Sequence, residues 1–105
     1  MRETKADHVT VEEFARMLRR FGVNTGRRRL MKQLQLDGFL IVRGGERNLP
    51  TRAALELGLM EIRESCIRTP EGIQPIKAAV ITDKGQVYFM SRYLEAEEGG
   101  IADDL

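Results

Sequence analysis

Thr25 to Leu40, TGRRRLMKQLQLDGFL, is the stretch that decides the fold. The hydroxyl of Thr25 can accept hydrogen bonds from the first turn of a helix, and Gly38 can adopt the left-handed conformation that ends one. At 100° per residue the apolar and basic side chains separate onto different sides. The apolar side holds Leu30, Met31 and Leu34, and the other holds Arg28, Arg29, Lys32 and Gln35. The stretch predicts a helix that presents arginines to a partner, although a solvated surface helix has the same pattern.

A second amphipathic helix is predicted just before it, over Thr10 to Phe21. Thr10 and Glu13 have the spacing of a capping box, in which each side chain bonds the backbone amide of the other residue. The apolar residues at helical spacing predict a core face of Val11, Phe14, Leu18 and Phe21. Only residues 22–24 separate the two helices, so they must turn sharply, as in a helix-turn-helix. A helical hairpin without a nucleic-acid role is the alternative.

The composition predicts one compact domain. The chain has 105 residues, 42% of them apolar, which suffices for a core without disulfides or metal. Cys66 is the single cysteine and can form no internal disulfide, which indicates a reducing environment. No apolar run approaches the ~20 residues that span a bilayer, and the first ten residues lack a signal-peptide core. We therefore expect a cytoplasmic protein with no membrane partner.

Charge is divided unevenly along the chain, although the formal net charge is only +1. Residues 1–52 hold twelve Lys/Arg and six Asp/Glu, a net charge of +6, while residues 53–105 hold five and ten, a net charge of −5. Basic charge gathered in one part of a domain can follow a phosphate backbone. Arginine outnumbers lysine thirteen to four, and its planar fork suits phosphates, guanine edges and protein interfaces alike.

The middle of the chain predicts a strand, a loop, a short helix and a β-hairpin. Phe39 to Val42 is an apolar run typical of a buried strand, and the glycines at 44–45 predict a loop. Thr51 can cap, and Gly58 can end, a packing helix over residues 52–57. Strands over residues 59–67 and 73–82 then pack as a hairpin against the helices, with Pro75 at an edge. Arg63, Arg68 and Lys77 are the candidate basic residues of this hairpin.

A last helix is predicted from the Thr82 cap to about Glu95. Its spacing predicts a core face of Val87, Met90 and Leu94. That arrangement leaves Leu36, Tyr88 and Phe89 as apolar groups that are either covered by the hairpin and loops or used in a contact. Residues 95–105 hold five acids and no base, which is typical of a solvated tail.

The sequence offers no chemistry for an enzyme. His8 is the single histidine and precedes the first predicted helix, so no histidine-based acid–base site or Cys/His zinc site can be assembled. The glycines at 44–45 lack the lysine and Ser/Thr of a phosphate-binding loop. We therefore predict no catalytic residue, no metal and no cofactor.

Four motifs in order resemble the KilAC domain, the C-terminal domain of phage antirepressor proteins. After a first helix, the pattern R-L-x-x-x-L-x-x-x-G-[YF]-L is met by Arg29-Leu30, Leu34 and Gly38-Phe39-Leu40. Asn48, Pro50 and Thr51 meet N-x-P-[TY], and T-x-K-G-x-x-Y-[FL] is met by Thr82, Lys84, Gly85, Tyr88 and Phe89. The resemblance covers about Val9 to Leu94 and departs from the family at Gln33 and Gln35, where members often have an aromatic and a basic residue.

The resemblance implies a DNA-binding domain of phage or prophage origin in a bacterial host cell, usually found behind a separate N-terminal domain. It leaves open whether DNA or a repressor protein is the main partner. Together with the residue patterns it predicts an α+β winged helix-turn-helix of three to four helices with a β-hairpin wing. Residues 9–94 would form this domain, residues 1–8 a disordered lead-in and residues 95–105 an acidic tail.

We expect Thr25 to Asp37 to be the recognition helix in the DNA major groove. Its expected contact residues are Arg27, Arg28, Arg29, Lys32 and Gln35. Arg28, Lys32 and Gln35 share an outward stripe and are the expected base contacts. Arg27, Arg29, Arg19 and Arg20 are the expected phosphate contacts.

The alternative is a protein-interaction module that binds and inactivates a phage repressor. In that case the arginines would pair with acids of the repressor, and Leu36, Tyr88 and Phe89 would be buried in the contact. The same aromatic pair could instead join two copies into a homodimer, which would place two recognition helices roughly 34 Å apart on DNA.

Overall fold

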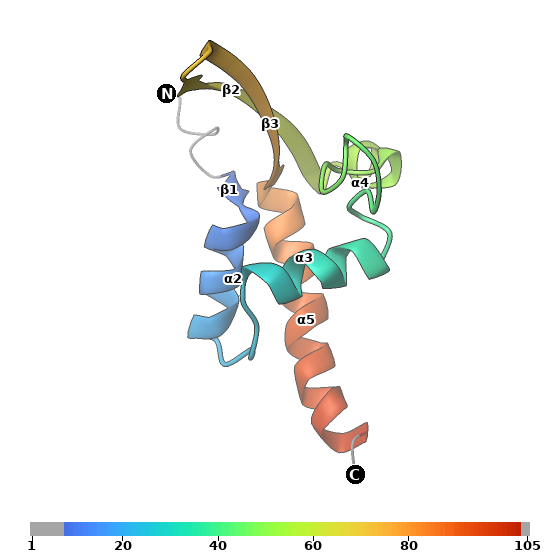
Figure 1. Ribbon diagram of the computed structural model, residues 1–105. Helices are drawn as coiled ribbons and strands as arrows, with labels where there is room; N and C mark the ends of the chain where they lie inside the picture. The colour runs from blue at the N-terminus through green and yellow to red at the C-terminus, as the bar shows by residue number, and fades with distance from the viewer. Residues whose placement is uncertain (1–7, 104–105) are drawn as a thin grey trace.

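The computed structural model describes the backbone of residues 8–103 and the side chains of residues 8–96. In chain order its elements are β1 (Val9–Thr10), α2 (Val11–Arg20), α3 (Arg27–Leu36), α4 (Arg52–Glu56), β2 (Met60–Thr69), β3 (Gly72–Ile81) and α5 (Asp83–Asp103). These four helices and one antiparallel sheet confirm the predicted α+β class. In Figure 1, α3 lies across α5, the β2–β3 hairpin rises from one end of the helices, and α5 extends from the other. Within this described part, no helix is long and apolar enough to cross a membrane.

The sheet has the strand order β1-β3-β2 and confirms the predicted hairpin. β2 and β3 pair over ten residues each, from Met60 opposite Ile81 to Thr69 opposite Gly72, whereas β1 pairs with only the last two residues of β3. The hairpin base is buried, but nearly all of residues 61–78 are exposed. The hairpin therefore projects from the helices and does not lie against them along its length. This leaves the side chains of Ile62, Ile67, Ile73 and Ile76 exposed.

Three helices end in the same way, at the glycines that the sequence predicted as stops. Gly22, Gly38 and Gly58 all have a positive φ, of 93°, 87° and 74°. After each glycine, the next amide donates to the carbonyl five residues earlier, at 3.0, 2.8 and 3.1 Å. These donors are Val23, Phe39 and Leu59, and their side chains are buried. Each helix end is therefore a Schellman motif with its hydrophobic contact.

Thr51 joins the end of α3 to the start of α4. Its hydroxyl accepts a hydrogen bond from the Ala54 amide at 3.3 Å, which confirms the predicted cap. The same hydroxyl donates to the Gly38 carbonyl at 2.8 Å, and the Thr51 amide donates to the Phe39 carbonyl at 3.0 Å. One residue thus satisfies backbone groups of two helices.

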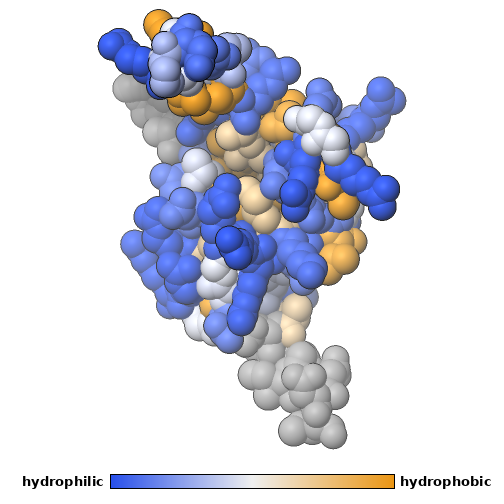
Figure 2. Space-filling model, viewed as in Figure 1, coloured by the Kyte–Doolittle hydropathy of each residue, from blue (hydrophilic) through white to orange (hydrophobic). Residues whose placement is uncertain are grey.

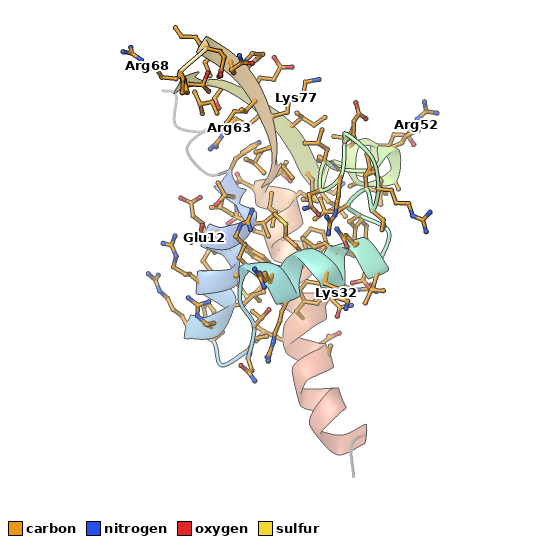
Figure 3. The ribbon with its side chains drawn as sticks, in the orientation of Figure 1. Glu12, Lys32, Arg52, Arg63, Arg68 and Lys77 are labelled. Carbon is orange, nitrogen blue, oxygen red and sulfur yellow. The ribbon has the colours of Figure 1, made fainter. Side chains whose placement is uncertain are left out.

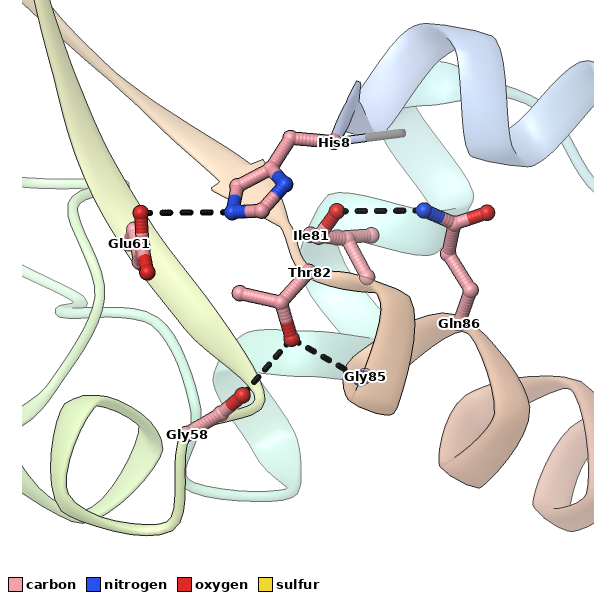
Figure 4. A network of polar contacts seen from close by, with 7 residues as sticks. All are labelled: His8, Gly58, Glu61, Ile81, Thr82, Gly85 and Gln86. Carbon is pink, nitrogen blue, oxygen red and sulfur yellow. Dashed lines mark hydrogen bonds and ion pairs between the residues drawn. The ribbon is translucent and has the colours of Figure 1, made fainter. Parts of the chain in front are cut away.

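Thr82 repeats this arrangement between α4 and α5 (Figure 4). Its hydroxyl accepts from the Gly85 amide at 3.0 Å and donates to the Gly58 carbonyl at 2.6 Å, while its amide donates to the Leu59 carbonyl at 3.1 Å. The predicted cap is confirmed, and the helix start is again fixed to the preceding helix end.

The core forms around Phe89 of α5, which is fully buried. Its ring makes edge contacts with Phe14 and Phe39, at centroid distances of 6.4 and 5.2 Å, and stacks on Tyr93 at 5.8 Å. The sequence also predicted core positions for Leu18, Leu30 and Leu34, which are buried as expected. The aromatic cluster around Phe89 connects α2, the segment that follows α3, and α5.

Two core predictions are wrong. Val87 is 70% exposed and Phe21 is 63% exposed. In α5, Gly85 packs on the Leu59 backbone, which turns residues 89 and 93 inward and Val87 outward. Phe21 lies at the end of α2, where the turn at Gly22 directs its side chain away and buries residue 23 instead.

Other element boundaries also differ from the predictions. Thr25 does not cap α3, because Gly26 is the N-cap residue and makes no side-chain hydrogen bond. Residues 39–42 form no strand, and Leu40 makes only an isolated bridge with Pro50. Val9 and Thr10 form β1, and α5 continues from Glu95 to Asp103. The predicted lead-in, apart from residue 8, and the side chains of residues 97–105 in the predicted tail lie outside the described residues.

Replacing Gly85 with alanine tests the contact that sets the rotation of α5. A Cβ at this position would collide with the Leu59 carbonyl oxygen and lie 2.9 Å from Cγ2 of Ile81. We expect Gly85→Ala to lower the free energy of unfolding by about 1–3 kcal/mol, measured by urea denaturation. Gly45→Ala is the matched control, because no atom lies within 4 Å of its Cβ. Equal stability of the two variants would contradict the close packing.

Candidate nucleic-acid interface

The basic side chains of α3 face away from the core. Leu30 and Leu34 are buried on its inner side, so the outer side is exposed to solvent. The exposed basic residues are Arg27, Arg28, Arg29 and Lys32. Among residues 8–96, none of these four forms an ion pair with a carboxylate. Their charge is therefore available to a negatively charged partner.

The first turn of α3 concentrates positive charge. It holds three arginines and no acid, although acidic residues are the stabilising choice near the positive end of a helix dipole. Because Gly26 provides no side-chain cap, the amides of this turn also remain open to an external acceptor. Helix N-termini of this kind bind phosphate oxygens. This turn therefore combines open amide donors with guanidinium groups.

Two arginines hold the connection between α2 and α3. Nη1 of Arg19 donates to the Thr25 carbonyl at 3.4 Å, and Nη1 of Arg29 donates to the Asn24 carbonyl at 3.3 Å. Each guanidinium has further N–H donors and remains exposed. Arg20, the third basic residue expected here, is also exposed. The structure therefore places the expected phosphate contacts around one turn.

Gln35 is engaged within the protein. Its side-chain amide donates to Oδ1 of Asn48 at 2.6 Å, and the pair is partly buried. Asn48 has a φ of 71°, in the left-handed region. To contact a base, as the sequence predicted, Gln35 would have to give up this hydrogen bond. Within the described residues, the side chains of Arg28 and Lys32 form no comparable hydrogen bond or ion pair.

The basic residues of the hairpin are exposed but lie on two faces. Side chains alternate along a strand, and opposite residues share a face. Arg63 lies opposite Ala78 on one face, whereas Lys77 lies opposite Glu64 on the other face, which also carries Arg68. Figure 3 shows Arg68 near the hairpin tip, with Arg63 and Lys77 directed to different sides. The structure therefore does not gather these three residues into one patch.

One hollow brings the hairpin and α3 together. It has a volume of about 680 Å³ and lies between the start of α2, α3, β3 and residues 45–49. Arg27, Arg47 and Lys77 line it, together with the carboxylates of Glu12, Glu46 and Glu64. Figure 2 shows apolar surface in the space between the hairpin and the helices, with hydrophilic side chains around it. Sequence reasoning missed Arg47, although its place in a glycine-containing loop was a signal.

Phe89 is not available as an interface residue, contrary to the prediction, because it is buried at the centre of the core. Leu36 is 72% exposed, and Tyr88 is half-exposed. Leu36 borders a second hollow of about 500 Å³ between α3 and α5. In this hollow, the Tyr93 hydroxyl donates to Oδ2 of Asp37 at 3.0 Å. Burial, and then the Asp37 charge, raise the pKa of Tyr93 well above its usual range, so this hydroxyl remains a donor.

Comparisons with known proteins indicate one family. The family model described as the phage antirepressor protein KilAC domain matches residues 3–96. Protein kilA of Escherichia phage P1 is 30% identical over 95 residues, which is 90% of this chain and 34% of that relative. No solved structure gives a significant match.

Replacing Gly26 with aspartate tests the charge of the first turn of α3. Its extended backbone accepts any residue, and the nearest group to a Cβ there is Nη1 of Arg19, at 3.8 Å. An aspartate can cap the open amides and offset the arginines, so we expect the free energy of unfolding to rise by about 0.5–1 kcal/mol. Gly26→Asn provides the cap without the charge. The difference between the two variants should shrink in high salt, and no difference at low salt would contradict an electrostatic cost.

Proposed function

Because the chain belongs to the family of phage antirepressor KilAC domains, we propose that it is a DNA-binding domain of a phage or prophage regulator. KilAC domains are not an enzyme family. The chain spans 34% of the length of kilA, so the proposal concerns this domain. The activity of a complete antirepressor would include further parts.

The proposed architecture is a winged helix-turn-helix. α2 and α3 form the helix pair, α3 is the recognition helix in the major groove, and the β2–β3 hairpin is the wing. The glycine turn after α2 and the exposed outer side of α3 support this assignment. The hairpin that projects beyond the helices has the length to reach a DNA backbone beside the groove.

The first turn of α3 carries the proposal. It holds three arginines, has no side-chain cap, and forms no ion pair within the described residues. In helix-turn-helix proteins, the N-terminal residues of the recognition helix contact base edges. Arg28 and Lys32 are the proposed base contacts, since both are suited to guanine. Arg27 and Arg29, with Arg19 and Arg20 of α2, are the proposed phosphate contacts.

A contact with a repressor protein is the second candidate, favoured by Leu36. This side chain is 72% exposed on the helix that also carries the arginines. Apolar and arginine anchors together are typical of protein interfaces. A homodimer could use the same residue together with Tyr88, but not the buried Phe89.

A salt series measured by fluorescence anisotropy tests the DNA proposal. Wild type should bind a labelled duplex at low salt and weaken steeply as salt rises. Arg28→Gln and Lys32→Gln should each cost about 1–3 kcal/mol on the preferred sequence and relax specificity. The double variant Glu12→Gln/Arg16→Gln is the control, because it removes the Glu12–Arg16 ion pair of 3.8 Å as a unit and leaves the net charge unchanged. No binding by folded wild type at low salt would end the proposal.

Leu36→Asp separates the two candidates. It removes the exposed apolar group but adds a negative charge, which repels DNA. Leu36→Gln removes the apolar group without adding a charge and should leave DNA affinity unchanged. A purified phage repressor that binds wild type, binds Arg28→Gln equally well and fails to bind Leu36→Gln would support the protein contact instead.

A further inference from the structure

The loop of residues 41–49, between α3 and α4, is held as a closed unit. Its ends meet at the Leu40–Pro50 bridge. Inside, the Ile41 amide donates to the Leu49 carbonyl at 2.9 Å, and the Asn48 amide donates to the Ile41 carbonyl at 2.8 Å. The 41–49 loop therefore has a defined backbone path.

The loop is also fixed to α3 from the side. The Gln35–Asn48 hydrogen bond of 2.6 Å joins the C-terminal end of the helix to the end of the loop. Arg47 precedes Asn48 and lines the same hollow as Arg27 of α3 and Lys77 of the hairpin. The Gln35–Asn48 hydrogen bond thus helps to place Arg47 beside the proposed recognition helix and the wing.

The backbone conformation favours glycine at only one of the two glycine positions of the loop. Gly44 has a φ of 86°, so the turn itself favours glycine there. Gly45 has no positive φ, and no atom lies within 4 Å of a Cβ built on it. Neither conformation nor packing within the described residues requires glycine at this position. A bare backbone does, however, permit close approach of another molecule.

The charges of the loop also point outward. Arg43 and Arg47 are exposed, and within residues 8–96 neither forms an ion pair. Glu46 is the one acid of the loop. Of the other carboxylates at the hollow, Glu12 is paired with Arg16 and Glu64 lies opposite Lys77. Arg43 and Arg47 therefore have no acidic partner within the described residues.

We propose that the 41–49 loop is a second nucleic-acid contact, with Arg43 and Arg47 bound to backbone phosphates beside the bases that α3 contacts. Gly45 lets the loop backbone approach the nucleic acid, and Gln35 is a positioning residue that holds the loop through Asn48. This inference rests on the proposed DNA-binding function and adds to it a site that the helix and wing do not provide.

The slope of log affinity against log salt concentration tests the two arginines. Each phosphate contact contributes about 0.9 to this slope on duplex DNA. Arg43→Gln and Arg47→Gln should each reduce it by about that amount and weaken binding equally on preferred and random duplexes. The double variant Glu12→Gln/Arg16→Gln should leave the slope unchanged, and Glu46→Gln should raise affinity because it removes a repulsive charge.

Gly45→Val tests close approach. Because the position is open within the fold, the midpoint of thermal unfolding should stay within about 2 °C of wild type, while affinity should fall at least about fivefold. Gly45→Ala should have a smaller effect of the same kind. Unchanged affinity in the valine variant would place the nucleic acid away from the loop.

Gln35→Met tests the positioning role, since it keeps the side-chain length and removes the amide donor. We expect the same loss of salt slope as in Arg47→Gln, and little further loss in the double variant, because both changes remove one contact. A loss confined to one DNA sequence would make Gln35 a base contact instead. Additive losses would also contradict positioning.

The outcomes separate the two proposals. If folded wild type does not bind DNA at low salt, the DNA function fails and the loop contact fails with it. If wild type binds and Arg28→Gln weakens binding, but neither Arg43→Gln nor Arg47→Gln alters the salt slope, the loop contact alone is overturned.

Discussion

The fold depends on two threonine hydroxyls that each bond two helices at once. Thr51 and Thr82 accept from the first turn of one helix and donate to the glycine carbonyl at the end of the helix before it. Backbone groups at helix ends have no partner within their own helix, and burial without one costs about 1–3 kcal/mol per group. These bonds fix the start of α4 to the end of α3, and the start of α5 to the end of α4, although a loop and the β2–β3 hairpin separate these helices in the chain.

The motifs that identify the family are therefore mainly parts of this framework. Gly38 and Thr51 belong to the first junction, Thr82 and Gly85 to the second, and Phe89 fills the core between the helices. Such residues report how the chain folds, because each is demanded by a backbone bond or by a lack of space. The partner contacts that we propose lie mainly outside this framework, on the outer side of α3, the hairpin and the 41–49 loop.

Sequence reasoning succeeded where the cause was local. A glycine that ends a helix, a threonine that caps one and a hairpin of two ten-residue strands all follow from neighbouring residues. It failed where a distant contact decided. The rotation of α5 is set by Gly85 against the Leu59 backbone, so Val87 was wrongly assigned to the core and Phe89 was misplaced at the surface. The other two members of the predicted stripe, Met90 and Leu94, do pack against the core. For the candidate site, the exposure of the α3 arginines was predictable. The hydrogen bond between Gln35 and Asn48 was not predictable, because it joins residues thirteen positions apart in the sequence.

The helix that departs from the local rules is the one that carries the candidate site. Thr10 caps α2 in a capping box, and Thr51 and Thr82 cap α4 and α5. α3 instead begins at Gly26 without a side-chain cap and places three arginines at the positive end of its dipole. Relative to a side-chain cap, the glycine costs a few tenths of a kcal/mol, and arginines at the positive end of the dipole are unfavourable as well. Departures from local consistency concentrate at functional sites, because there a partner supplies the missing interaction. A phosphate group would supply both an acceptor for the open amides and a negative charge for the arginines.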